Sequence, residues 1–314
     1  MIVIDWWSPE PHAEFNKNLY AILKNASKIY IFNIALASSC GKTVIIKNTS
    51  NRFLRALLVF KICWKHRHSR LIFASYDDLF IPFIQLYVKK IFCYEHNTTP
   101  DYIVRNKHAI WQRLTFRKIT RLCQSKSQLD ILREMGQKSF WLGLPISKTV
   151  NLTQESEEPV FIFCSEQFSD QEAKSVIPYL YGRILAKKSL DLSKKISFPE
   201  NLKVDLVDSI LIPSDFLNVQ AFVIALNSSV RGTGWYNEAI VYGIPLIITS
   251  AGQQHVFETT YPEYPFIKGN ALKSSEDLMK QIVEIKKFDN ANYVKKYTKD
   301  LQFRLENLLN YKEG

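Results

Sequence analysis

The chain has 314 residues, of which 46% are apolar, so it can bury more than one hydrophobic core, and usual domain sizes favour two domains. Its five cysteines lack the short spacings of a zinc site or a disulfide framework, which argues against both. The net charge of +11 is uneven: residues 1–150 hold 23 Lys and Arg against 9 Asp and Glu, whereas residues 151–314 hold 18 against 21. A positive first half suits an anionic partner such as a phosphate, a nucleic acid or a lipid headgroup.

The first half alternates short β-branched or aromatic strands with amphipathic helical stretches, the pattern of a parallel α/β sheet. We predict strands at residues 2–6, 29–33, 43–47, 71–75, 91–95, 122–125 and 139–142. Helices are predicted at residues 12–24, 51–65, 82–89, 107–120 and 126–135, the last ended by Gly136. This pattern predicts a Rossmann-like N-terminal domain.

Residues 146–159 are polar and end in a proline, a composition typical of a linker, so we predict an N-terminal domain at 1–147 and a C-terminal domain at 148–314. The second domain repeats the α/β pattern. Its predicted strands are 160–164, 203–207, 221–226, 246–249 and 266–268, and its predicted helices are 171–187, 235–242, 275–286 and a terminal helix at 290–309. No apolar run reaches the roughly 20 residues that cross a bilayer, and no secretory signal is visible, so we expect a cytoplasmic protein.

The most informative segment lies between two predicted strands, at residues 221–249. Gly232 and Gly234 let backbone amides approach an anion, and the following helix N-terminus adds partial positive charge. Arg231, next to Thr233 in this loop, can donate charge-assisted hydrogen bonds to a diphosphate. Glu238 follows one helical turn later and can accept from both hydroxyls of a ribose. The alternative is a plain strand-to-helix turn with a solvated Glu238.

The order of loop, Glu238-Ala239, Gly243 and Pro245 resembles the donor half of the GT-B glycosyltransferases, of the kind named glycosyl transferases group 1. The resemblance implies an α/β fold with two Rossmann-like domains facing each other across a cleft. It also implies that the C-terminal domain binds a nucleotide sugar, UDP- or GDP-linked, with the loop at the diphosphate and Glu238 on the ribose. A weaker resemblance at residues 122–145, to the segment that closes the N-terminal domain of these enzymes, is explained equally well by an ordinary strand-helix-strand unit.

Two further points concern the donor site. Ser165 follows a predicted strand, and the resemblance implies that it contacts the donor phosphates. Many retaining members of the group place a second Glu eight positions before the matched one, where this chain has Val230, or Arg231 if the loop is one residue shorter. The resemblance therefore does not choose between retention and inversion of the sugar's configuration.

Polar residues at the ends of two first-half strands are candidates for catalysis, because ligands of open α/β sheets bind beyond the strand carboxyl ends. Glu95 or His96 could take the proton of an acceptor hydroxyl as it attacks the anomeric carbon. Glu10 and His12, after the first strand, compete for that role on the acceptor side. The alternative is that Glu95 and His96 serve locally in hydrogen bonds or ion pairs, and that residues 8–12 form a proline-shaped turn.

Basic and aromatic residues interleave at residues 52–70, 87–92 and 105–121. Basic amphipathic helices of this type lie on anionic membrane surfaces, although a solvated basic face has the same composition. We therefore expect peripheral attachment to the inner face of the cell membrane.

Together these features predict a metal-independent glycosyltransferase, hexosyl or related, that needs no cofactor besides its nucleotide-sugar donor. No Asp-x-Asp motif of the metal-dependent kind occurs. By analogy, the acceptor is a glycan or lipid-linked glycan in cell-surface polysaccharide biosynthesis, such as capsule or lipopolysaccharide. The alternatives are a nucleotide-sugar epimerase of the same architecture and a basic nucleic-acid-binding protein. We expect no nucleic-acid partner, because no recognition-helix motif supports one.

Overall fold

The structure is a computed structural model that describes residues 1–6, 13–23, 28–32, 43–45, 51–95, 111, 114–146, 149–150, 158–164, 169–190, 196–208, 210, 218–226 and 234–310. The chain forms two compact units. The first comprises Met1–Ser147 with Thr298–Gly314, and the second comprises Lys148–Tyr297.

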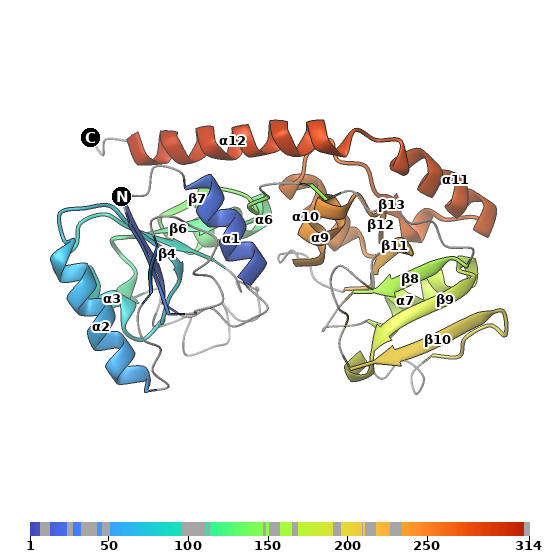
Figure 1. Cartoon of the computed structure of the whole chain (residues 1–314), viewed down its shortest axis with the longest axis horizontal. Coiled ribbons are helices and arrows are strands. Elements are labelled where there is room, and N and C mark those ends of the chain that lie inside the picture. The colour runs from blue at the N-terminus through green and yellow to red at the C-terminus, as the bar shows by residue number, and fades with distance from the viewer. Residues whose placement is uncertain are drawn as a thin grey trace. The chain divides into compact units, whose positions relative to one another are not determined.

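The first unit is built on a parallel sheet (Figure 1). Seven strands are described, in the spatial order β3-β2-β1-β4-β5-β6-β7. They are β1 (Ile2–Asp5), β2 (Lys28–Ile31), β3 (Thr43–Ile45), β4 (Leu71–Ser75), β5 (Ile91–Tyr94), β6 (Ile119–Cys123) and β7 (Ser139–Trp141). The central strands β1, β4 and β5 are buried along almost their whole length, which explains their nearly continuous apolar sequences.

The helices of the first unit cover both faces of this sheet. Those described, besides the end of the terminal helix, are α1 (Ala13–Ile22), α2 (Arg52–Lys65), α3 (Ile81–Ile84) and α6 (Lys126–Glu134). One core joins α2 and α3 to the side chains of Ile4 and Phe73. The next residue along β1, Asp5, points to the opposite face and meets Tyr20 of α1. Figure 1 shows α1 apart from α2 and α3, on the other side of the strands.

The second unit repeats the arrangement with six described parallel strands in the order β10-β9-β8-β11-β12-β13. These are β8 (Val160–Phe163), β9 (Gly182–Lys187), β10 (Leu202–Val207), β11 (Val219–Ile224), β12 (Leu246–Ile248) and β13 (Ile267–Lys268). The helical elements described before the terminal helix are α7 (Asp170–Val176), η3 (Ile177–Tyr179), η4 (Lys188–Leu190), α9 (Gly234–Tyr242), α10 (Ala251–Thr260), η6 (Gly269–Ala271) and α11 (Ser275–Lys286). Side chains of α7 and α11 pack with Val223 in the main core, whereas Trp235 of α9 packs on Phe222, which points to the opposite face.

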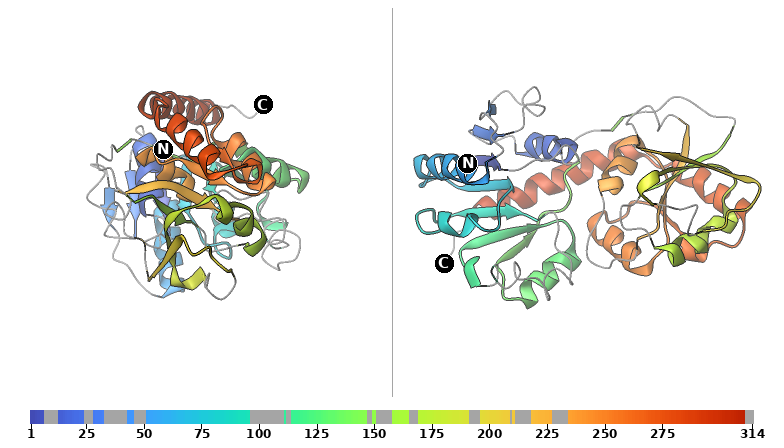
Figure 2. Two further views of the ribbon diagram at one scale, coloured as in Figure 1. Left: turned by 90° about the vertical axis from the view of Figure 1, so that its right-hand side faces the viewer. Right: turned by 90° about the horizontal axis from the view of Figure 1, so that it is seen from below.

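The terminal helix α12 (Asn290–Asn310) is one continuous helix, seen along its length in Figure 1 and in the right panel of Figure 2. Its first part belongs to the second unit, where the Tyr297 hydroxyl donates to the Thr260 carbonyl at 3.2 Å. From Thr298 onward it belongs to the first unit. There the Arg304 guanidinium lies 3.7 Å from the centroid of the Trp141 ring, a cation–π contact. The sequence had suggested that the whole helix belongs to the second domain.

Most predicted elements are confirmed to within a few residues, and Gly136 ends α6 in the left-handed region at a φ of 70°. The helix predicted at 171–187 is wrong. It divides into α7, η3 and the strand β9, because Pro178 and Gly182 interrupt it. The helix predicted at 107–120 is wrong at its end, since residues 119–120 open β6. The strand β9 and the α-helix α10 were not predicted, and neither were the short 3-10 helices η3, η4 and η6.

No helix among the described residues combines the length and apolar character needed to span a membrane.

Candidate functional site

The strand order of the second sheet marks a place for a ligand. From β8 the chain builds outward through β9 to β10, and from β11 it builds the other way through β12 to β13. In such sheets ligands bind beyond the carboxyl ends of the two strands that flank the reversal. Those ends are Phe163 and Ile224. The predicted donor residues Ser165 and 231–233 follow these two ends along the chain and lie outside the described residues.

The helix α9 brings Glu238 to this same end of the sheet. It begins at Gly234, directly after the predicted phosphate loop, and Glu238 is half-buried on its second turn. Burial raises the pKa of the Cys164 thiol, and the negative charge of Glu238 raises it further. Because Cys164 directly follows β8, the Glu238 carboxylate lies within electrostatic range of the strand reversal. A carboxylate at this position can accept hydrogen bonds from the sugar hydroxyls of a nucleotide.

Buried hydrogen bonds anchor α9 on the side away from solvent. The Tyr236 hydroxyl donates to the Gln253 side-chain oxygen, and both side chains are fully buried. The neighbouring Asn237 accepts a hydrogen bond from the Tyr261 hydroxyl. These bonds fix the rotation of the helix about its axis. Glu238 therefore has a defined direction before any ligand arrives.

The Gly-x-Pro motif of the sequence ends α9. Gly243 takes a φ of 64°, and the Ile244 amide donates back to the Ala239 carbonyl at 2.8 Å. The Gly243 amide donates to the Ile240 carbonyl, which completes the Schellman pattern of a helix C-terminus. Pro245 then leads into β12. Gly243 and Pro245 thus determine where α9 ends. They affect the candidate site only indirectly, by fixing the position of the helix that carries Glu238.

Ser250 was missed by the sequence reasoning. Its hydroxyl donates to the Leu226 carbonyl at 2.7 Å and accepts from the Gln253 amide at 3.2 Å, as the N-cap of α10. Because Leu226 directly precedes the predicted phosphate loop, Ser250 holds the residue before that loop to the neighbouring strand end. A Ser followed three residues later by Gln is a capping pattern, and it could have predicted both α10 and this cap.

In the first unit, Glu95 follows β5 and is 4% exposed. Both of its oxygens are engaged by Arg121: Nε donates to Oε1 at 2.7 Å and Nη2 to Oε2 at 2.6 Å. The Tyr76 hydroxyl also donates to Oε1. Neighbouring strand segments therefore supply a buried cluster of Tyr76, Glu95 and Arg121, here named the Glu95 cluster.

The Glu95 cluster behaves as a fixed ion pair. Burial by itself would lower the pKa of Arg121, but the charge and hydrogen bonds of Glu95, together with Tyr76 and Asp78, raise that pKa overall. Burial and the Glu95 charge raise the pKa of Tyr76, which stays a neutral donor. The Gln124 side-chain amide donates to the Glu95 carbonyl at 2.8 Å. This environment favours a positioning role for Glu95, at the base of the segment that begins with His96.

The remaining acceptor-side candidates lie outside the described residues, namely Glu10, His12 and His96. The structure describes the strands that precede them, β1 and β5. At the end of β1, the Asp5 carboxylate is buried and accepts hydrogen bonds from the Tyr20 hydroxyl at 2.7 Å and from the Ser75 hydroxyl at 2.5 Å. These bonds fix the carboxyl ends of β1 and β4, which flank the strand reversal of the first sheet.

Within the described ranges, no group of three or more His, Cys, Asp and Glu side chains is arranged to hold a metal ion.

No protein-family model matches the chain, and no curated protein matches it. Solved structures do. Anabaena Alr3699/HepE in complex with UDP-glucose is similar with a TM-score of 0.63 and 9% identity, over 98% of both chains. A glycosyltransferase from Rickettsia africae is similar with a TM-score of 0.50 and 12% identity, over 98% of this chain and 93% of that one. The O-GlcNAc transferase of Thermobaculum terrenum has a TM-score of 0.59 and 11% identity, over 98% of this chain and 66% of that one.

These neighbours are GT-B glycosyltransferases, so the likeness shows that this chain has the GT-B fold of two Rossmann-like units. The predicted α/β class and this two-domain architecture are confirmed.

Proposed function

We propose that the chain is a glycosyltransferase that moves a sugar from a nucleotide-sugar donor to a glycan or lipid-linked glycan acceptor. The observation that carries the proposal is the placement of Glu238, on a rigidly anchored helix at the carboxyl end of the second sheet. The fold neighbour Alr3699/HepE was solved with UDP-glucose, which supports a UDP-linked donor, and a GDP-linked donor is the alternative.

In this proposal the donor lies over the loop before α9. The Glu238 carboxylate binds the ribose, while Arg231, Thr233 and the glycines at 232 and 234 hold the diphosphate, with Ser165 beside them. The amides at the start of α9 and the Arg231 guanidinium offset the charge of the departing diphosphate. Transfer of a hexosyl or related sugar then requires no metal ion and no further cofactor.

For the catalytic base we propose His96 ahead of Glu95. A general base needs a free lone pair directed at the acceptor hydroxyl. Both Glu95 oxygens already accept hydrogen bonds from Arg121, whereas His96 directly follows this fixed residue. Glu10 and His12 are proposed to lie on the acceptor side, because their segment follows β1 at the strand reversal of the first sheet.

For the biological setting we propose cell-surface polysaccharide biosynthesis, with capsule or lipopolysaccharide intermediates as acceptors, at the inner face of the membrane. The support is the excess of 23 Lys and Arg over 9 Asp and Glu in residues 1–150, which suits lipid phosphates.

The test is thermal stability in the presence of UDP-, GDP-, CMP- and dTDP-sugars. A ligand at 100 times its dissociation constant stabilises the folded state by about 2.7 kcal/mol, so one family of nucleotides should raise the melting temperature. Glu238→Ala should remove most of that rise. The control is Glu284→Ala, which changes an exposed acid on α11 and should keep it. Absence of stabilisation by every nucleotide sugar would contradict the proposal.

A further inference from the structure

Large apolar side chains are exposed in one region of the first unit. Among the described residues, eight of the eleven exposed large hydrophobic side chains fall between residues 53 and 114. They are Phe53, Leu54, Leu57, Trp64, Leu79, Phe83, Leu86 and Leu114. Single exposed apolar residues are normal on a protein surface, but a concentration of them marks a surface that binds something.

On α2 these side chains form a stripe. Phe53, Leu57 and Trp64 are separated by four and seven positions, so they lie on one side of the helix. The opposite side carries buried residues such as Val59 and Cys63, which pack in the core. The helix is thus apolar on both sides. Its outer side exposes 68% of Phe53 and 62% of Leu57.

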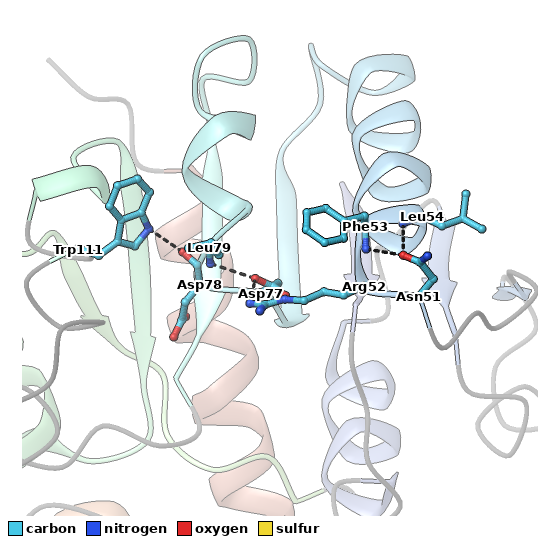
Figure 3. A network of polar contacts seen from close by, with 8 residues as sticks. All are labelled: Asn51, Arg52, Phe53, Leu54, Asp77, Asp78, Leu79 and Trp111. Atoms are coloured by element: carbon cyan, nitrogen blue, oxygen red, sulfur yellow. Dashed lines mark hydrogen bonds and ion pairs between the residues drawn. The ribbon is translucent and has the colours of Figure 1, made fainter.

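Residues 77–90 lie alongside α2 and extend the stripe. Ring centroids are 5.5 Å apart for Phe53 and Phe80, and 5.4 Å apart for Trp64 and Tyr87. Figure 3 shows the start of this contact, where Arg52 reaches Asp77. We name the outer side of both segments the α2–α3 surface, and its exposed apolar members are Phe53, Leu57, Trp64, Phe83 and Leu86.

The charges of the α2–α3 surface are almost all positive. Asp77 and Asp78 are the only acidic residues between positions 51 and 94. Arg52 engages Asp77 through two hydrogen bonds of 2.5 and 2.8 Å, which neutralises it. The Arg67 guanidinium lies 5.0 Å from the Trp64 ring centroid. Besides Arg52, the exposed cations between positions 51 and 94 are Lys61, Lys65, Arg67, Lys89 and Lys90.

We propose that the α2–α3 surface docks on an anionic lipid bilayer, with its apolar side chains inserted at the boundary between headgroups and acyl chains. Phe, Leu and Trp bordered by Lys and Arg are the composition of elements that lie in the bilayer interface. Protein interfaces, by contrast, are depleted in Lys. The inference rests on the proposed function in one respect, because a lipid-linked acceptor gives the docking its purpose.

Insertion is tested with polar replacements at the two leucines of the α2–α3 surface. The full chain is sedimented with vesicles of equal parts phosphatidylcholine and phosphatidylglycerol, without sugar nucleotide. Leu57→Gln combined with Leu86→Gln should weaken binding by about tenfold or more, since the inserted area is lost. Val283→Gln combined with Phe303→Gln is the matched control: both side chains are exposed, at 48% and 64%, but lie on α11 and α12. This control should bind like the wild type.

The electrostatic part is tested in the same assay. Each Lys or Arg near an anionic membrane raises the affinity about fivefold. Lys61→Glu combined with Lys89→Glu replaces two cations by anions, so each substitution should weaken vesicle binding by more than about fivefold. Lys280→Glu combined with Lys287→Glu makes the same change of charge on exposed residues at α11 and should bind more tightly than the first pair. Pure phosphatidylcholine vesicles should bind far less protein.

Brominated acyl chains give a direct measure of insertion. They quench indole fluorescence near the headgroup boundary, so the wild type should be quenched more than Trp64→Phe. Equal loss of binding in the surface variants and their controls, or quenching unchanged by Trp64→Phe, would overturn the proposal. Because the vesicle assay contains no sugar nucleotide and the thermal assay contains no lipid, failure of docking and failure of sugar-nucleotide binding are separate results.

Discussion

Glu95 and Glu238 are both acidic residues near the carboxyl end of a parallel sheet, and their surroundings differ. Glu95 is 4% exposed and its two oxygens are occupied by Arg121 and Tyr76. Glu238 is half-buried, on a helix whose neighbouring residues are anchored inward. The first carboxylate is committed to holding strands together. The second lies near the strand reversal of its sheet, the kind of place where open α/β sheets bind ligands.

The difference shows that a position at the end of a strand does not by itself make a polar residue catalytic. A carboxylate removed from water needs partners that offset the cost of its burial, as Arg121 and Tyr76 do for Glu95. A residue that binds substrate must instead keep some hydrogen-bonding capacity for the ligand. The two carboxylates should therefore respond in opposite ways to substitution, one in stability and the other in binding.

The largest expected effect is on stability, in the Glu95 cluster. Arg121→Met leaves the Glu95 carboxylate buried without its cation, which should lower the free energy of unfolding by about 3 to 5 kcal/mol. Denaturant unfolding of the purified chain measures it. Adding Glu95→Gln to that variant should recover part of the loss, because the uncompensated charge is removed. A loss no larger than an average surface substitution would show that the ion pair does not hold the strands.

The second effect is on binding, at Glu238. Glu238→Gln should change the free energy of unfolding by no more than about 0.5 kcal/mol, since the side chain is part-exposed on a helix anchored by other residues. Affinity for the nucleotide sugar should fall about tenfold, as for loss of hydrogen bonds to a charged group. Calorimetric titration and unfolding of the same preparation separate the two. A large loss of stability with unchanged affinity would show that Glu238, like Glu95, stabilises the fold and does not bind the nucleotide sugar.

Most of the fold could be predicted from sequence because the central strands are apolar runs with clear ends. The strand β4 and the helix α11 have the bounds that the sequence predicts. The sequence does not predict the strand β9, because residues 171–187 also satisfy a helical period, although Pro178 and Gly182 interrupt it. Gly182 adopts a φ of 83° where an added Cβ would lie 2.6 Å from the Pro159 carbonyl oxygen, a constraint set by the fold.

The site was only partly predictable, because its partners are distant in sequence. Glu95 and Arg121 are 26 residues apart, and they meet through the register of β5 and β6, in which Cys93 lies opposite Arg121. No local pattern specifies that register, so the sequence could suggest Glu95 as a base but not reveal its partner. The end of α9 was more predictable, since Gly243 and Pro245 are contiguous with the helix and their turn chemistry is local.

The smallest expected effect is at Ser250, which caps α10 and also contacts the residue before the predicted phosphate loop. Ser250 and Ser274 both cap helices, accepting from the amides of Gln253 and Asp277 at 3.2 Å in each case. Replacing either by Ala should lower the free energy of unfolding by about 1 kcal/mol. Only Ser250 also donates to the Leu226 carbonyl at the start of the loop. Ser250→Ala should therefore weaken nucleotide-sugar binding as well.

Ser274→Ala is the matched control, because it loses the same kind of cap at α11 and should bind nucleotide sugar like the wild type. Affinity and stability measured on both variants give the comparison. If the two lose affinity equally, the effect follows from general destabilisation, and Ser250 has no separate role. A loss of affinity confined to Ser250→Ala would show that Ser250, directly before α10, supports nucleotide-sugar binding in addition to capping that helix.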